Sequence, residues 1–336
     1  MKQDNGYIPP FTITPKILSL VSEISEAVTR LEILEPSTIS PTLRKVNKIK
    51  TITGTLEIEG NTLGVEKVTA ILEGKRVLGS VREIAEVNGA IKVYDKLDDF
   101  EYAELNDLLS AHKLLMDEIL SGAGKFRNRD VGVGGQDGVV HVAPPHFNVP
   151  DLMYDLFSWL ASTDIHPLVK SSVFHYEFEF IHPFIDGNGR IGRFWQSLIL
   201  HDWKPIFSAI PVESVVRDAQ ENYYKALEDS GCAGESTPFI EFMLEAIVKT
   251  CRDILSDKQN VPINVPKNVP LRRAEQILDE IGKDKEITID QLAGLCGVSS
   301  KTIKRDIAKL KDEHKLERLG SLKSGHWNIL SNAVLK

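Results

Sequence analysis

The chain has 336 residues, of which 42% are hydrophobic, 26% are charged and 7% are aromatic. This length predicts about two or three domains, and the composition excludes a disordered chain, a collagen-like repeat and a membrane bundle. The formal net charge of −8 argues against nucleic-acid binding by a surface of uniform charge, because affinity for DNA comes largely from neutralising phosphates.

The sequence predicts a cytoplasmic chain without membrane contacts. Residues 1–7 contain no apolar h-region of a secretory signal, and no run of about 18 apolar residues suits a membrane span. Three cysteines occur, and their odd number and spacing fit neither a disulfide framework nor a zinc site. They are Cys232, Cys251 and Cys296.

Most of the first 256 residues are predicted to be helical, because apolar residues recur near every 3.6 positions. The segments with this period are Ile17–Leu31, Glu83–Tyr94, Tyr102–Leu120, Leu152–Leu160 and Ile240–Leu255. The stretch 126–145 differs, since it is rich in Gly and Val and has two short apolar runs around residues 134–138. This pattern predicts a β-hairpin, although a connecting loop explains the same residues.

The most informative segment is Phe180–Trp195, which reads FIHPFIDGNGRIGRFW. Gly187 and Gly189 allow main-chain N–H groups to approach a ligand closely, and a helix that begins near Gly189 has an anion site at its N-terminus. Arg190 and Arg193 lie three residues apart on one face of that helix, and the planar guanidinium suits phosphate oxygens. The segment therefore predicts a phosphate-binding site.

Two further side chains in this segment suit phosphoryl chemistry. Asp186 is the only acid of the segment and is the natural carboxylate ligand for a Mg²⁺ ion shared with nucleotide phosphates. His182 suits a general base toward an incoming hydroxyl. Each feature alone is more often structural, whereas their grouping within a few residues predicts a site.

The run His182–Arg193 resembles the signature of the Fic-domain family, HPFx(D/E)GNGRxxR, and matches it at every specified position. The resemblance implies transfer of AMP from ATP to a Ser, Thr or Tyr hydroxyl of a protein target, including the chain itself. It implies that His182 deprotonates the hydroxyl, that Asp186 holds Mg²⁺ and that Arg193 contacts the γ-phosphate. The residues implied to cradle the α- and β-phosphates are Gly187, Asn188, Gly189 and Arg190.

The same resemblance gives the Gly- and Val-rich stretch a role. The family uses a hairpin flap before the motif to align the target chain by strand addition, and we expect that flap over Val131–Val142. Tyr223 or Tyr224 lies where the family often places an aromatic residue beside the adenine, although core packing explains these tyrosines equally well. His175 is predicted to be structural, because nothing near it in the motif supplies further metal ligands.

Upstream, Thr55–Asn61 reads TLEIEGN and resembles the inhibitory motif (S/T)xxxE(G/N) of the family. Thr55 and Glu59 share a face of a helix. The resemblance implies that the Glu59 carboxylate pairs with Arg193 and takes the arginine that the γ-phosphate needs. A surface acid at a helix end is the alternative. Beside a complete active-site motif we expect autoinhibition by Glu59, relieved by Glu59→Gly.

The C-terminal tail differs from the body in charge. Residues 257–270 read DKQNVPINVPKNVP, and the three Val-Pro steps favour an extended linker. Residues 271–336 contain thirteen Lys and Arg against ten Asp and Glu, so the tail is mildly basic and the body carries the acidic excess. The net charge of the whole chain therefore does not exclude DNA binding by the tail.

The tail is predicted to form a helix-turn-helix over Thr288–Leu295 and Ser300–Asp312. Leu316–Leu319 and Leu322–Ile329, joined at 320–321, predict a β wing. The whole tail resembles a winged-helix domain of bacterial transcription regulators. The apolar face of the second helix is formed by Ile303, Ile307 and Leu310, and the cations away from it are Lys301, Lys304 and Arg305. DNA contact and protein docking or dimerisation are the two alternatives for this domain.

The predicted fold is therefore mainly α, with a Fic helical core, a β-hairpin flap and a small winged helix-turn-helix domain. The predicted domains are 1–100 (helical, with the inhibitory motif), 101–256 (Fic core), 257–270 (linker) and 271–336 (winged helix). The predicted function is protein adenylylation with ATP and Mg²⁺, a protein target as partner, and DNA and further copies of the chain as candidate partners. Two alternatives are removal of AMP from a modified protein, with Glu59 orienting a water, and a nucleotide-sensing transcription regulator.

Overall fold

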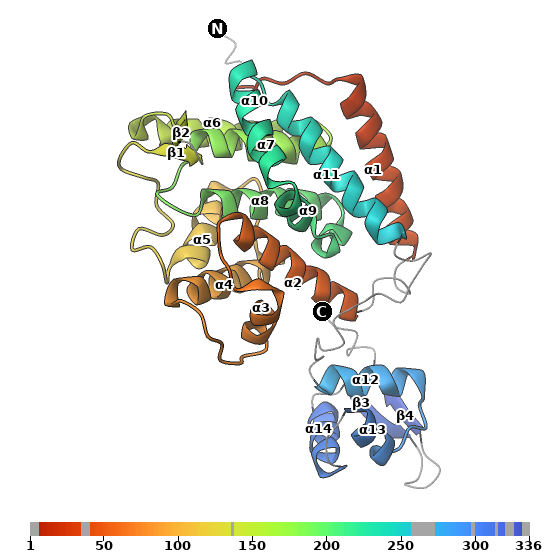
Figure 1. The fold of residues 1–336 in the computed structure, drawn as a ribbon. Coiled ribbons are helices and arrows are strands. Elements are labelled where there is room, and N and C mark those ends of the chain that lie inside the picture. Colours follow the sequence, from red (N-terminus) through yellow and green to blue (C-terminus); the bar gives the residue numbers. More distant parts are fainter. Residues whose placement is uncertain are drawn as a thin grey trace. The chain divides into compact units, whose positions relative to one another are not determined.

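The computed structural model describes residues 7–34, 41–135, 138–256, 273–296, 300–312, 315–319 and 326–330. The chain divides into two compact units, Met1–Ile263 and Asn264–Lys336 (Figure 1). The predicted linker 257–270 lies outside the described residues. Within the described residues, no helix is both long and apolar enough to cross a membrane.

The first unit is mainly helical, as the sequence predicts. Its α-helices are α1 (Pro15–Leu34), α2 (Pro41–Ile58), α3 (Gly64–Leu72), α4 (Val81–Tyr94), α5 (Leu105–Met116), α6 (Val149–Ser162), α7 (Pro167–Ile181), α8 (Asn188–Trp203), α9 (Val212–Asp218), α10 (Gln220–Ala233) and α11 (Thr237–Ser256). Short 3₁₀ helices lie at Leu97–Asp99, His146–Asn148 and Pro205–Ala209. The predicted helix over 102–120 is too long at both ends, because Glu104 has an extended backbone (ψ 113°) and the chain turns after Met116.

Helices α7 and α8 pack against each other at the centre of this unit. Pro167 begins α7, where its missing N–H costs no helical hydrogen bond. Nearly every side chain of α7 is buried, so the helix has no polar face. Gly187 precedes α8 with a φ of 86°, and a Cβ at this position would lie 2.8 Å from the Met116 Sδ. The glycine therefore permits both the left-handed backbone and the close approach of α5.

The N-terminal helices belong to the same unit as the rest of the body. Helix α1 packs along α11 (Figure 1), and α2 packs on α9. Gly54 of α2 permits this last contact, because a Cβ there would lie 3.0 Å from main-chain atoms of Glu213. Residues 1–100 and 101–256 thus share one compact unit, and helix α2 carries the Thr55–Asn61 segment directly to the centre of it.

A hairpin interrupts the helices between α5 and α6. Strands β1 (Gly132–Gly135) and β2 (Gly138–Val142) are antiparallel. Gly132 pairs with Val142 and Gly135 with Gly138, and the register shifts between Val133 and Gly134. The sequence predicts the turn around residues 134–138; of these, 134, 135 and 138 belong to the strands, and 136–137 lie outside the described residues.

The second unit contains α12 (Arg273–Lys283), α13 (Ile289–Cys296), α14 (Ser300–Asp312) and the antiparallel strands β3 (Leu316–Leu319) and β4 (His326–Ile329). Ile303, Ile307 and Leu310 of α14 are buried in its core, as the apolar face predicts. Trp327 of β4 is also buried, and its Nε1–H donates to the Ile287 carbonyl at 3.0 Å. The predicted turns at 297–299 and 320–321 lie outside the described residues.

Candidate active site

The segment between α7 and α8 is a tight loop that begins at His182. His182 has left-handed backbone angles (φ 50°, ψ 61°), which are unusual for a residue with a Cβ. Its N–H donates to the Phe178 carbonyl at 2.9 Å and ends α7. Asn188 closes the loop, because its side-chain oxygen accepts from the Phe184 N–H and its amide donates to the Phe184 carbonyl, both at 2.9 Å. The Asn188 side chain is therefore used to shape the loop.

Glu179 is a buried carboxyl directly beside His182. Its Oε2 lies 3.8 Å from the His182 Nδ1, one turn back along α7. Burial raises the pKa of Glu179 to about 8, with the Glu59 charge adding to this rise and Arg193 opposing it. Glu179 is thus largely protonated at neutral pH, so this site holds a neutral acid next to the predicted base.

The N-terminus of α8 presents Arg190, whose side chain is 3% exposed. Its Nη2 donates to Asp186 Oδ1 at 2.9 Å, and its Nη1 lies 3.3 Å from Glu86 Oε1 of α4. Among the described residues, the buried Arg190 Nε has no hydrogen-bond acceptor, and Nη1 has only the ion pair with Glu86, without hydrogen-bond geometry. The first N–H groups of a helix also have no partner within it. Helix start and guanidinium together provide donors suited to an anion.

Asp186 lies at the same helix start with its carboxylate 32% exposed. Oδ1 accepts from the Gly187 N–H at 2.6 Å and from Arg190, and Oδ2 accepts from Arg82 of α4 at 2.7 Å. A single carboxylate that shares a cation with substrate phosphates is a common Mg²⁺ arrangement, so Asp186 fits the predicted role. In the described part of the chain, no group of three or more His, Cys, Asp and Glu side chains has the geometry of a protein-only metal site.

His112 of α5 fixes the main chain of Asp186. The Gly124 N–H donates to His112 Nδ1 at 2.9 Å, so the proton is on Nε2, which donates to the Asp186 carbonyl at 2.9 Å. Burial lowers the pKa of His112 to about 4, and its ring stacks on Phe184 with centroids 3.6 Å apart. A neutral imidazole therefore holds the metal-binding candidate in place.

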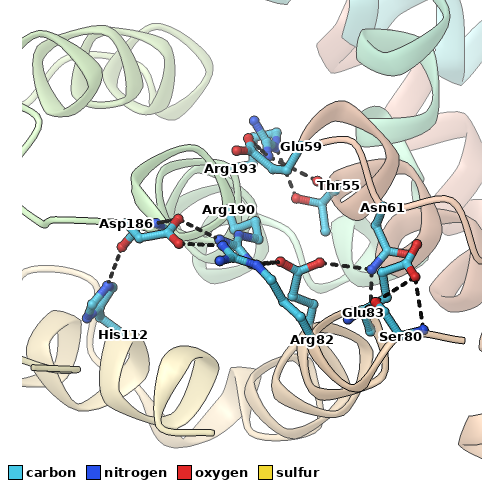
Figure 2. Close-up of polar contacts among 12 residues, drawn as sticks. Thr55, Glu59, Asn61, Ser80, Arg82, Glu83, His112, Asp186, Arg190 and Arg193 are labelled. Carbon is cyan, nitrogen blue, oxygen red and sulfur yellow. Dashed lines mark hydrogen bonds and ion pairs between the residues drawn. The ribbon is translucent and has the colours of Figure 1, made fainter. Parts of the chain in front are cut away.

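Arg193 is as enclosed as Arg190, with 3% of its side chain exposed. Its Nη2 donates to Glu59 Oε1 at 2.6 Å and to the Thr55 carbonyl at 3.1 Å, and its Nε donates to Thr55 Oγ1 at 2.9 Å (Figure 2). A Cβ on Gly189 would lie 2.3 Å from Glu59 Oε1. The Glu59 carboxylate thus lies against the start of α8, where the sequence predicts phosphate.

A polar network continues from this point to α4. The Asn61 amide donates to Glu86 Oε2 at 2.9 Å, and Arg82 Nε lies 3.2 Å from Glu86 Oε1. Figure 2 shows Asn61, Arg82, Arg190 and Asp186 along this network. Glu86 is therefore a common partner of Arg82, of Arg190 and of Asn61, which belongs to the segment that carries Glu59.

The two predicted adenine-side tyrosines differ in exposure. Tyr223 is 1% exposed, and its hydroxyl lies 3.1 Å from His175 Nε2. Its ring is in the core, so the prediction of an adenine contact does not fit Tyr223; Tyr224 is 49% exposed, and for this residue the prediction stands. Burial lowers the pKa of His175 to about 3, and Nδ1 lies 2.6 Å from Gln196 Oε1, which agrees with a structural histidine.

Several residues of the site are not among those predicted from the sequence. Glu179 lies three positions before His182, but α7 is buried on nearly all sides and shows no apolar period, so nothing in the sequence distinguishes this residue. Arg82 and Glu86 of α4 had no readable signal either, because their contacts with Asp186 and Arg190 join residues about a hundred positions apart. Arg127, which contacts the His182 carbonyl at 2.9 Å, also had no distinguishing pattern.

Comparisons with known proteins agree with this geometry. The sequence profile of the Fic/DOC family matches residues 102–200. The structure is similar to the crystal structure of a Fic family protein from Desulfovibrio desulfuricans, with a TM-score of 0.73 and 41% sequence identity over 97% of this chain and 99% of that chain. The chain belongs to the Fic family.

Other Fic proteins are more distant. Fic-1 from C. elegans is similar with a TM-score of 0.56 over 73% of this chain and 72% of that one, at 22% identity, which shows a shared fold. Curated relatives named "Protein adenylyltransferase Fic" are 27% identical over 235 residues in Drosophila mojavensis and 27% identical over 245 residues in Aedes aegypti. They align with 67% and 69% of this Fic chain, which spans only 44% of the length of each.

The second unit has its own match. A profile described as a DeoR-like helix-turn-helix domain matches residues 273–323. The predicted helix-turn-helix at the C-terminus of this Fic protein is therefore confirmed.

Proposed function

We propose that this Fic protein transfers AMP from ATP to a Ser, Thr or Tyr hydroxyl of a protein, including its own chain. The observation that carries the proposal is Arg193, a buried guanidinium of α8 whose anionic partner is a carboxylate from the turn that follows α2. Its neighbours on the motif have the chemistry that an attack at the α-phosphorus requires, namely a base, free main-chain donors and a second arginine.

In the proposed reaction His182 takes the proton of the target hydroxyl through the ring nitrogen that does not face Glu179. The hydroxyl oxygen forms a bond to the α-phosphorus, the bond from that phosphorus to the bridging oxygen breaks, and pyrophosphate leaves. Arg190 and the N–H groups at the start of α8 would bind the α- and β-phosphates, and Arg193 the γ-phosphate. Positioning and charge neutralisation supply most of the catalysis in this class of reaction.

Asp186 is the residue that would hold Mg²⁺. When bound, Mg²⁺ neutralises charge on the phosphates during the transfer. The contacts of Asp186 with Arg82 and Arg190 would keep its carboxylate at the mouth of the phosphate site.

We propose that Glu59 inhibits the reaction. Its carboxylate takes Arg193 at 2.6 Å and lies against Gly189, so ATP binds without its γ-phosphate contact and with its α-phosphate turned away from in-line attack. In the same proposal the hairpin Gly132–Val142 aligns the target chain by strand addition.

Intact mass spectrometry after incubation with ATP and Mg²⁺ tests the proposal. Glu59→Gly is expected to gain one AMP per modified hydroxyl, and the wild type is expected to gain far less. The double variant with Glu59→Gly and His182→Ala is expected to gain no AMP. Equal labelling of wild type and Glu59→Gly would remove the inhibitory role, and labelling without His182 would remove the assignment of the base. Release of AMP from a chain that was modified beforehand, without net addition, would assign the reverse reaction instead. Light scattering on the same samples measures whether copies of the chain associate.

We also propose that the second unit binds DNA, because it contains a DeoR-like helix-turn-helix domain. Lys304 and Arg305 of α14 are exposed and suit phosphate contact. A gel-shift titration of the full chain is expected to show binding that weakens with salt, and Lys304→Ala with Arg305→Ala is expected to lower the salt dependence. Binding that is absent at low salt would favour protein docking for this domain.

A further inference from the structure

Arg127 lies between the base of the hairpin and the loop of His182, and its side chain is fully buried. It precedes β1 by five residues. Burial lowers the pKa of its guanidinium from the ordinary value, which means that the site is costly for a cation. The nearest carboxylate oxygen, Asp130 Oδ1, is 3.8 Å from Nη1 and belongs to a side chain that is 66% exposed. An ion pair therefore does not explain why the guanidinium is buried here.

Main-chain carbonyl groups account for the position of the guanidinium. Two of them flank the hairpin: Nη1 donates to the Arg129 carbonyl at 3.1 Å, and Nη2 donates to the Pro144 carbonyl. The other two lie in the catalytic segment: Nε donates to the His182 carbonyl at 2.9 Å, and Nη2 also faces the Ile181 carbonyl at 3.4 Å. One rigid, planar group thus contacts both ends of the hairpin and the residue that carries the base.

The main chain of the same residue adds a further contact. The Arg127 N–H donates to the Pro183 carbonyl at 2.9 Å. Three consecutive carbonyl groups, those of residues 181–183, therefore accept from Arg127. His182 is the residue with φ of 50°, and these bonds hold its carbonyl on the side that the left-handed backbone requires.

A second contact at the base of the hairpin, between Asp130 and His146, joins fewer segments than Arg127 does. Asp130 Oδ1 accepts from the His146 N–H at 2.7 Å and lies 2.9 Å from its Nδ1. This contact joins the two ends of the hairpin to each other and does not include the His182 loop. Arg127 contacts both ends of the hairpin and the His182 loop.

We propose that Arg127 is a positioning residue that sets the hairpin in register with His182, and thereby places the hydroxyl of a target segment on the hairpin within reach of its base. This inference rests on the proposed AMP transfer. It identifies a group that acts through main-chain geometry and touches neither nucleotide nor target. A misplacement of about 1 Å between reacting groups is enough to cost about a hundredfold in rate.

The test uses the full-length chain with Glu59→Gly and compares Arg127→Lys with Arg129→Lys. Lysine keeps the charge and the alkyl chain but has no planar fork that reaches several carbonyls. Arg129 is exposed and lies two residues away, so the same exchange there is the matched control. Arg127→Gln is the second variant, because an uncharged side chain folds without the cost of burying a cation.

Two initial rates are measured with ATP and Mg²⁺: AMP added to the chain, by intact mass, and free AMP released to water, by chromatography. Water needs no alignment by the hairpin, so Arg127→Lys or Arg127→Gln is expected to lower the ratio of protein-bound to free AMP by at least about fivefold. Arg129→Lys is expected to leave the ratio unchanged. A role in folding alone lowers both products equally, so an unchanged ratio in the Arg127 variants would overturn the proposal.

Hydrogen exchange followed by mass spectrometry gives a readout that does not depend on the reaction. Peptides that cover 128–146 are expected to exchange at least about tenfold faster in the Arg127 variants than in Arg129→Lys. Unchanged exchange would also overturn the inference. If Glu59→Gly itself forms neither product, the proposed function fails, whereas the exchange experiment still decides whether Arg127 holds the hairpin to the His182 loop.

Discussion

Replacing Glu59 by alanine is expected to raise the affinity for ATP much more than the affinity for AMP. In the wild type Glu59 Oε1 is 2.6 Å from Arg193 Nη2, and 29% of the Glu59 side chain is exposed. ATP has the γ-phosphate that is proposed to compete for Arg193, whereas AMP lacks it. The comparison of the two nucleotides therefore isolates the competition at Arg193 from any general opening of the site.

The size of the effect follows from the partial burial of the pair. Exposed ion pairs contribute about 0.2–1 kcal/mol, and hydrogen bonds to charged groups contribute about 1.5–3 kcal/mol. Arg193 is buried and Glu59 is partly exposed, so a competition free energy of about 1.5–2.5 kcal/mol is reasonable. Since about 1.4 kcal/mol corresponds to a tenfold change, the affinity for ATP should rise by about 10- to 60-fold.

Isothermal titration calorimetry with ATP and with AMP is the assay, and every variant also carries His182→Ala so that ATP is not consumed. The matched control is Glu57→Ala. Glu57 is 29% exposed and pairs with Arg217 at 2.7 Å, so its removal breaks a similar ion pair two residues away. Arg217 does not belong to the phosphate motif, and we expect the affinities for both nucleotides to stay within about twofold in this control.

Two results would refute the reasoning. Equal gains for ATP and AMP in Glu59→Ala would mean that the substitution opens the site without freeing an arginine for the γ-phosphate. An equal gain in Glu57→Ala would mean that any loosening of the end of α2 has the same effect. In either case the contact between Glu59 and Arg193 would not be a competition with ATP.

Further predictions concern the carboxyl groups of Asp186, within the motif, and of Glu179, directly before it. Arg82→Gln is expected to raise the affinity for Mn²⁺ by about two- to fivefold, measured by electron paramagnetic resonance, because Asp186 Oδ2 loses a cationic partner that is 61% exposed. Lys92→Gln on the same helix, which breaks the ion pair of Lys92 with Glu118, is the control and should leave the affinity unchanged. Equal Mn²⁺ affinities in the two variants would contradict a role of Arg82 at Asp186. Glu179→Gln is expected to gain stability over the wild type as pH rises from 5 to 8, measured by urea unfolding. The raised pKa of about 8 keeps the proton on Glu179 in the folded state while the unfolded chain releases it, so wild-type stability falls with pH in this window. A pH-independent difference would show that the folded carboxyl ionises normally.

The fold could be predicted where one side of an element faces water. Helices α1, α4 and α11 have the apolar period of a half-buried helix, and the sequence predicts each of them. Helix α7 is buried on nearly all sides, so it has no period for the sequence to display. The sequence also does not predict that α7 ends at His182, because a left-handed backbone at a residue other than glycine is set by the surrounding contacts.

Those residues of the site could be predicted that belong to a short, continuous sequence motif. The run from His182 to Arg193 and the segment around Glu59 both follow local patterns, and the structure brings Glu59 and Arg193 into contact. The inhibitory role remains a prediction. Contacts that depend on tertiary packing were beyond the sequence: the link from Asn61 through Glu86 to Arg190 follows from how the helices pack. For Tyr223 the sequence left core packing and an adenine contact as alternatives, and its side chain is buried.

The burial of Arg193 implies that ATP binding exchanges one anion for another. Because Glu59 is partly exposed, the loss of this partner costs about 1.5–2.5 kcal/mol, so a state with neither Glu59 nor phosphate beside Arg193 is a minor one. The strength of the inhibition is then set by how firmly the end of α2 is held against α8. That end is held from outside the motif, since Gln220 of α10 donates to the Ile58 carbonyl at 2.8 Å, whereas the partly exposed pair of Arg217 with Glu57 adds little. The contact of α10 with the end of α2 should therefore influence the affinity for ATP although this helix does not belong to the phosphate motif.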